Sequence, residues 1–199
     1  MPRSHDNLNR PLMVVALWCG LLPAASVRAE QIDESKSLKV KAAYLYNFAK
    51  FINWPVNALE RQDTLFVVCV LDDEPFAHSL SATVRGKSVA NRAVKIRRLS
   101  WAERRDRTSV SACQIVYIGQ SVRHRLGDIL TLLKEEPVLV VSDIDGFARQ
   151  GGMIGFVLEQ GRIVFEINRR ALERVRLKAS AKLLRLARIV ETRVTGADG

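Results

Sequence analysis

Residues 64–71 read TLFVVCVL, a continuous apolar run rich in β-branched side chains. Such a run is typical of a central strand in a parallel sheet, because both faces of that strand are covered. Two similar runs follow, CQIVYIG at 113–119 and PVLVVS at 137–142, and helices are expected between these runs at 75–84 and 122–134. This alternation of strand and helix predicts a doubly wound α/β fold.

A long helix is expected over residues 35–54, ahead of the first run. Its apolar side chains form two stripes at helical spacing on different faces: Leu38, Leu45, Ala49 and Ile52 in one, and Tyr44, Phe48 and Phe51 in the other. A helix that is apolar on two sides is either sandwiched in the core or shared with a partner. Pro55 is expected to end this helix by restricting Trp54.

AVKIRRL at 93–99 alternates apolar and basic residues, as an edge strand does. In the last third of the chain, residues 153–158 and 162–167 predict a β-hairpin. Basic helices are expected over 169–176 and 181–191. We therefore expect an α/β fold with a mostly parallel sheet of about six strands flanked by helices, with a C-terminal β-hairpin and basic helices.

The first 29 residues predict a cleaved signal peptide. Arg3 and Arg10 precede an apolar run from Leu12 to Leu22, and Val27-Arg28-Ala29 offers small residues for cleavage. The run is shorter than the roughly 20 apolar residues that span a bilayer. We expect a signal peptide at 1–29, a single domain over 30–199, and a periplasmic location.

The chain is strongly basic, with a formal net charge of +10. Residues 1–29 hold three basic residues and one acid, so their removal would leave +8. This charge favours an acidic partner, an anionic ligand or a membrane surface. We expect no nucleic-acid partner, because no helix-turn-helix, RNP-like or zinc-finger pattern is present.

Two cysteines, Cys69 and Cys113, would remain after cleavage. An oxidising compartment favours a disulfide between them. Cys69 falls late in its predicted strand and Cys113 at the start of its own, so neighbouring parallel strands in simple register would hold them too far apart. A register offset or a bond between two chains would resolve this, and both alternatives are open.

The sequence carries no pattern typical of an enzyme. The first buried strand is followed by Asp72-Asp73-Glu74, where a dinucleotide site would have a glycine-rich loop. His78 and His124 have no spacing that suits a metal site or a catalytic triad. We therefore predict that the chain is not an enzyme and has no catalytic residues, cofactor or metal.

Three blocks of sequence resemble the YfiR-like family of periplasmic regulators, over about residues 38–188. They are KAAYLYNFAKFINWP at 41–55, the pair VCVLDDEPF at 68–76 and CQIVYIG at 113–119, and DIDGFARQGGMIGFV at 143–157, which runs on through 164–187. Their order and spacing are specific. The resemblance implies a parallel-type sheet flanked by helices, in agreement with the pattern of strands and helices.

The resemblance also implies a function. Such proteins are non-enzymatic, and the type member binds the periplasmic sensor domain of an inner-membrane diguanylate cyclase, which suppresses cyclic-di-GMP production and biofilm growth. An outer-membrane, peptidoglycan-binding lipoprotein can sequester it. Family members are also associated with redox sensitivity. Some have a second cysteine pair in the segment that matches 143–153; this chain has none there, so a redox switch would fall to Cys69 and Cys113.

Candidate binding residues fall into two groups. For a protein partner we expect aromatic and arginine side chains, since these are favoured at interface hot spots: Tyr44, Phe48, Trp54, Arg169, Arg170, Arg174 and Arg176. For a ligand pocket we expect Asp143, at the carboxyl end of a buried strand, with Gly151 and Gly152. Core packing, a solvated helix face and turn formation are the structural alternatives.

Two further possibilities are open. The two-faced helix suggests a homodimer. In function, the alternative is a periplasmic small-ligand-sensing domain that feeds a sensor kinase or a transporter.

Overall fold

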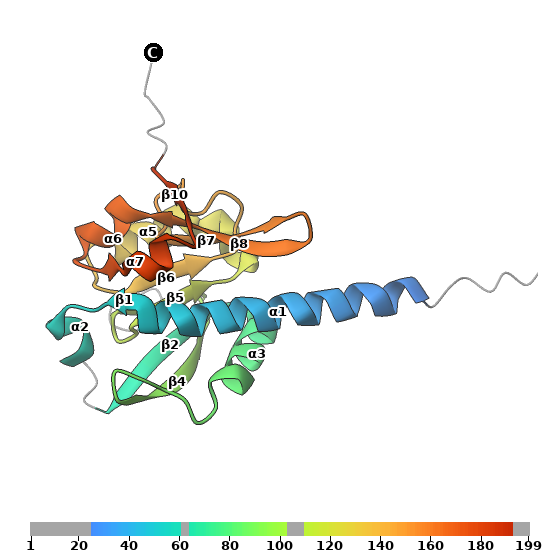
Figure 1. Ribbon diagram of the computed structural model, residues 1–199, viewed down its shortest axis with the longest axis horizontal. Coiled ribbons are helices and arrows are strands. Elements are labelled where there is room, and N and C mark those ends of the chain that lie inside the picture. Colours follow the sequence, from blue (N-terminus) through green and yellow to red (C-terminus); the bar gives the residue numbers. More distant parts are fainter. Residues whose placement is uncertain (1–24, 61–63, 103–109, 193–199) are drawn as a thin grey trace, which may run out of the picture.

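The computed structural model describes residues 25–60, 64–102 and 110–192. Its centre is a sheet of eight strands, in the order β10-β8-β7-β6-β5-β2-β4-β3, within the part of the chain described (Figure 1). The strands are β2 (Leu65–Leu71), β3 (Ser88–Val89), β4 (Arg92–Leu99), β5 (Ile115–Ile118), β6 (Leu139–Ser142), β7 (Ile154–Glu159), β8 (Arg162–Asn168) and β10 (Arg188–Val190). Within this eight-stranded sheet of the described residues, only β3 with β4 and β7 with β8 pair antiparallel, so the predicted mostly parallel α/β sheet is confirmed.

The helices cover both faces of the sheet. On one face, α1 (Ala25–Phe51) packs against α3 (Glu74–Val84), and the N-terminal part of α1 projects beyond the sheet (Figure 1). Tyr117 of β5 faces this side, because its ring lies 3.9 Å from that of Phe76 in α3. Its neighbour Val116 is in register with Cys69 and Val140, and this row faces the opposite side, beneath α5 (Leu126–Leu133).

Local chemistry explains where α3 begins. Asp73 is its N-cap, and its carboxylate accepts a hydrogen bond from the backbone N–H of Phe76. Pro75 stands in the first turn, where a missing N–H costs nothing. The run that precedes α3, β2, is buried from Phe66 to Leu71, as a central strand covered on both faces should be.

A second, two-stranded sheet ties the end of α1 to the C-terminal third of the chain. β1 (Ile52–Asn53) pairs antiparallel with β9 (Lys178–Ala179). The predicted end of the first helix is therefore wrong: α1 ends at Phe51 because Ile52 and Asn53 leave the helix to form this ladder, and Pro55 follows later. Both apolar stripes are buried or partly buried, so they pack against the rest of the fold, while Lys39, Asn47 and Lys50 of α1 are exposed.

Shorter helices complete the fold: α2 (Val56–Glu60), the 3-10 helix η1 (Gln120–Arg125), α6 (Arg169–Arg174) and α7 (Ala181–Leu184). The predicted helix over 181–191 is wrong, since α7 has one turn and Arg188–Val190 form β10. The reason is long-range pairing: β10 adds to the edge of β8, and Arg188 forms two hydrogen bonds with Glu159. The short β3 and β10 account for the difference between eight strands and the six expected.

The predicted signal peptide lies outside the described residues, apart from Ala25–Ala29. These five residues begin α1, so cleavage after Ala29 would shorten that helix at its start. Signal peptide and single domain both stay predictions. No helix among the residues described is long and apolar enough to cross a membrane.

Candidate functional site

Asp143 lies in a polar cluster at the carboxyl ends of the parallel strands. Its Oδ2 is 2.5 Å from the Lys41 Nζ of α1, and both side chains are mostly buried. Its backbone oxygen accepts a hydrogen bond from the Gln120 side chain. β4 lies on one side of β2 and β5 on the other, so the order of the strands reverses between β2 and β5. Open α/β sheets bind ligands at such a switch point.

The two loops at this crevice are in direct contact, and a cavity of about 430 Å³ lies beside that contact, lined by Asp72, Asp73, Arg98 and Ser121 among others. A Cβ on Gly119, directly after β5, would stand 2.6 Å from the backbone oxygen of Asp72 and 2.8 Å from the Cβ of Asp73. Ser121 also donates a hydrogen bond to the Asp72 oxygen. Glycine is therefore needed at 119 so that the β2 and β5 loops can touch. The loop contact holds the fold together, and Asp143 is not among the residues that line the adjacent cavity.

Burial shapes the electrostatics of the cluster. It raises the pKa of Asp73 above its ordinary 3.8; the N–H of Phe76 opposes this rise and Asp143 adds to it. Burial also raises the pKa of Tyr117 well above 10.0, with Asp143 and Asp73 contributing. The Tyr117 hydroxyl faces the Asp143 carboxylate, and this contact also raises the pKa of Tyr117, although neither that hydroxyl nor Oδ1 of Asp143 has a hydrogen bond of ordinary geometry among the residues described. This cluster therefore contains buried polar atoms that cost free energy.

The aromatic residues expected at an interface lie in different environments. Phe48 is fully buried, and it packs with Tyr44, Phe156 and Phe165 between α1 and the β-hairpin. It therefore has no surface for a partner in this structure. Tyr44 is partly exposed at the edge of that group. Trp54 is also partly exposed, and its ring packs edge-on against Phe66 while its N–H donates to the Ala49 oxygen.

The β1–β9 ladder brings Trp54 next to a basic segment. Asn53 pairs with Lys178, and continuing this antiparallel register places Trp54 opposite Leu177, which stands between Arg176 and Lys178 in the chain. Arg169 and Lys178 line one cavity together with Glu173, and the Lys182 Nζ stands 5.0 Å from the Phe51 ring centroid. We call this surface, made by Trp54, Arg169, Arg176, Lys178 and Lys182, the basic end. It lies at the amino ends of the parallel strands, away from Asp143.

The four predicted arginines do not form one group. Arg169 and Arg176 belong to the basic end, and Arg170 pairs with Glu191. Arg174 instead lines a cavity with Gly151 and Gly152. The predicted ligand residues are separated in the same way, since Asp143 does not line that cavity. All four arginines are exposed.

Cys69 and Cys113 form a disulfide within the chain, with Cα atoms 5.9 Å apart. The expected geometric obstacle assumed that Cys113 belongs to the strand. It lies two residues before β5 begins, outside the ladder, while Val116 is the partner of Cys69. Both cysteines are buried. In the chain-entropy model, closing a loop of this length contributes about 4 kcal/mol.

The comparisons with known proteins now identify the family. A family model described as YfiR/HmsC-like matches residues 38–188, about three quarters of the chain. The chain belongs to the YfiR/HmsC-like family. Members of this family are known as periplasmic regulators of diguanylate cyclases, and the family is regulatory rather than catalytic.

The other comparisons add less about this YfiR/HmsC-like protein. No curated protein matches it. Among solved structures, it is similar to an ABC domain in complex with L-Trp from Streptococcus pneumonia, with a TM-score of 0.50 and 10% identity. The match covers 62% of this chain and 55% of that one, so the chain spans about half of its structural relative. At this identity the likeness shows the fold alone.

Several residues of these sites had no clear signal in the sequence. Lys41 and Tyr117 read as ordinary helix and strand residues, and Lys178 as one more basic residue. Each gains its role from a contact across the fold: Lys41 with Asp143, Tyr117 with the cluster beside it, and Lys178 with β1. Among the residues described, no three His, Cys, Asp or Glu side chains gather as a metal site would require.

Proposed function

We propose that this protein is a periplasmic regulator that restrains an inner-membrane diguanylate cyclase by binding its periplasmic sensor domain, without being an enzyme itself. The observation that carries the proposal is the family match across residues 38–188. The predicted signal peptide and the positive charge agree with it. By this route the protein would lower cyclic-di-GMP and restrain biofilm growth.

Binding restrains an enzyme only if the protein prefers one conformation of it. The cyclase equilibrium shifts by the difference between the affinities for the inactive and the active sensor domain, and by no more. A restraint of a hundredfold therefore requires about 2.7 kcal/mol of differential binding. An interface with one well-packed aromatic anchor and several charged contacts can supply that difference.

The basic end is the surface that suits this partner best. It combines a rigid, partly exposed aromatic side chain, Trp54, with exposed Arg169, Arg176 and Lys178. A surface of this charge favours encounter with an acidic sensor domain. Tyr44, Arg170 and Arg174 lie elsewhere, so we place them outside this contact.

We propose two further partners. An outer-membrane, peptidoglycan-binding lipoprotein would relieve the restraint if it competed for the basic end. A homodimer would use other residues: Val40 of α1 and Leu158 of β7 are exposed apolar side chains that line one groove. These proposals are compatible, since the groove and the basic end share no residue.

The test is cellular cyclic-di-GMP in a strain that lacks the gene. We expect cyclic-di-GMP to rise on deletion and to fall again when the full chain is restored. The matched control restores residues 30–199 without residues 1–29, which should stay in the cytoplasm and leave cyclic-di-GMP high. Unchanged cyclic-di-GMP in the deletion strain, under conditions where the protein is normally made, would refute the proposal.

A further inference from the structure

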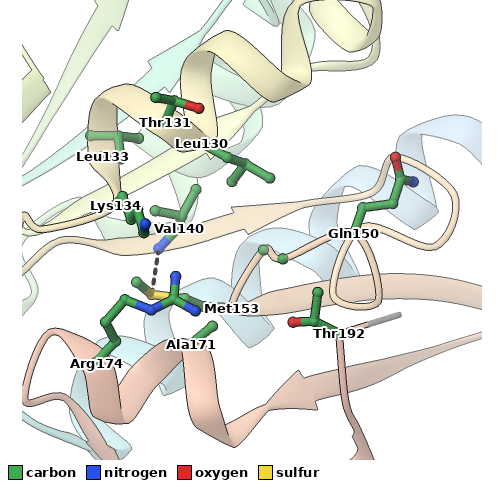
Figure 2. A pocket seen from close by; sticks show the side chains of 12 residues that line it. Leu130, Thr131, Leu133, Lys134, Val140, Gln150, Met153, Ala171, Arg174 and Thr192 are labelled. Atoms are coloured by element: carbon green, nitrogen blue, oxygen red, sulfur yellow. Dashed lines mark hydrogen bonds between the residues drawn. The ribbon is translucent and has the colours of Figure 1, made fainter. Parts of the chain in front are cut away.

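A cavity of about 210 Å³ lies beside Gly151 and Gly152, between α5, β6 and α6 (Figure 2). It exists because β6 and β7 pair only at Val141 and Ser142. Before that point β6 has no strand on this side, and the Val140 N–H donates to the sulfur of Met153, a weak acceptor. The sheet is therefore open where the cavity forms.

The lining combines apolar walls with a polar rim. The apolar side chains come from the two helices and the two strands around the cavity: Leu130, Leu133, Val140, Met153 and Ala171. Polar side chains follow at the rim: Thr131, Lys134, Gln150, Arg174 and Thr192. Two of the lining residues are cationic and none is Asp or Glu. The cavity therefore suits a ligand that is apolar at one end and negative at the other.

The two cations differ from their neighbours. Arg169 and Arg170 on the same helix each have an acidic partner, Glu173 and Glu191. Arg174 and Lys134 have no ion pair with any residue that the structure describes. In Figure 2 both side chains lie on the Val140–Met153 side of the cavity, across from Gln150 and Thr192. They therefore place two uncompensated positive charges next to the apolar walls.

Gly151 and Gly152 form part of the wall of this cavity. A Cβ on Gly152 would overlap the ring of Phe147, so glycine is required for that packing. Gly151 has φ +103°, which side chains rarely adopt, and its Cβ would stand 4.0 Å from Leu130. Glycine is therefore required at 152 by the packing of Phe147 and favoured at 151 by the backbone conformation.

We propose that this cavity binds a small organic monocarboxylate with an apolar body, such as a short-chain fatty acid or an arylacetate. The carboxylate would accept from Arg174 and Lys134, while the body would lie on Val140 and Met153. The volume is below the roughly 300–1,000 Å³ of sites for drug-sized molecules, so the ligand is small. This proposal does not rest on the restraint of a cyclase.

The lining also predicts what the cavity rejects. An amino acid would bring an ammonium group, and no carboxylate in the lining could pair with it. An alcohol would leave both cations unpaired. Inorganic phosphate would meet the cations and leave the apolar walls uncovered. The order of affinity should therefore be carboxylate first, with phosphate, alcohol and amine well below.

The experiment is titration calorimetry on the protein purified from the periplasm. Hexanoate and phenylacetate should bind saturably at one site, and about tenfold or more tighter than hexanol, hexylamine or phosphate at equal ionic strength. Exchanging the cations in K134Q/R174Q should weaken hexanoate binding by about tenfold or more. T131W, which adds bulk at an exposed rim position on α5, should weaken it as well.

R170Q is the matched control, because Arg170 is exposed on the same helix and lies outside the cavity. Hexanoate should bind it as it binds the natural protein. Circular dichroism should show that every variant keeps the native fold. The proposal is overturned if the folded natural protein shows no saturable binding, if hexylamine or phosphate binds as well as hexanoate, or if R170Q weakens binding as much as K134Q/R174Q.

Discussion

Asp73 has two opposed effects at the start of α3. Its carboxylate caps the helix by accepting from the Phe76 N–H, which stabilises the fold. Its charge is partly buried near Asp143, which raises its pKa and costs stability when it ionises. The sequence predicted a helix that begins at Pro75, but it predicted neither the cap at Asp73 nor the cost of its charge. That cost depends on burial and on Asp143, which lies seventy residues further along the chain.

The first prediction separates these effects. D73N keeps the cap and removes the charge, so at pH 7 it should unfold at the same or a higher temperature than the natural protein. D73A loses the cap and should be about 1 kcal/mol less stable. Because the folded-state pKa of Asp73 is raised, the cost of its charge appears as pH rises from 3.8 through that value. The advantage of D73N should therefore vanish below pH 3.8, as thermal melts at several pH values would reveal.

The second prediction concerns Tyr117. Its ring is fully buried against Phe76, and its hydroxyl has no partner of ordinary geometry in the described structure. The hydroxyl lies against the mostly buried Asp143 carboxylate, so Y117F removes a group that solvates this carboxylate and should be about 1 kcal/mol less stable by urea unfolding. A gain of stability in Y117F would mean instead that the hydroxyl is unsatisfied in the folded protein.

At the scale of elements, the Lys41–Asp143 pair joins α1 to the carboxyl end of β6. Both side chains are largely buried, so removing one leaves the other charge uncompensated. We expect K41M to cost about 3 kcal/mol in urea unfolding, and D143N a similar amount. The double variant K41M/D143N should cost clearly less than the sum of the two.

That double-mutant cycle has a control on the same helix. Lys50 is exposed and stands 5.5 Å from the Tyr46 ring centroid, without an acidic partner among the residues described. K50M should therefore cost about 1 kcal/mol or less, and it should be additive with D143N. Additive costs for K41M and D143N would show that the two side chains do not stabilise the fold as a pair.

The elements themselves were predictable wherever one strong local pattern specified them. The buried strands β2, β5 and β6 follow from their apolar runs, and the hairpin β7–β8 from its turn. The segment 181–191 was not, since α7 ends at Leu184 although the helical spacing of apolar residues continues through Ala187 and Val190. Beyond α7, Leu186 and Ile189 are exposed and the chain pairs with β8, which local spacing does not encode.

At the scale of the whole molecule, chain topology decides which residues share a surface. The four arginines of 169–176 are close in sequence, yet Arg174 faces the cavity and Arg176 the basic end. The two-residue ladder of β1 and β9 brings Trp54 to the segment that holds Arg176 and Lys178, and no apolar run in the sequence predicts that ladder. The candidate residues were therefore predictable one by one, while their grouping into sites required the fold.

The last prediction tests the basic end as a docking surface, and it rests on the proposed function. R176E/K178E reverses two charges there. Its association with the purified sensor domain of the cyclase should be about tenfold slower at low salt. The control K95E/R123E makes the same change in net charge at exposed positions on β4 and η1, away from the basic end.

Surface plasmon resonance at several salt concentrations distinguishes local from global charge. If docking uses the basic end, R176E/K178E should lose most of the salt dependence of the association rate, because that dependence comes from charges near the contact. K95E/R123E should keep it and associate only slightly more slowly. Equal slowing by both variants would mean that the net charge of the protein, and no particular surface, attracts the partner.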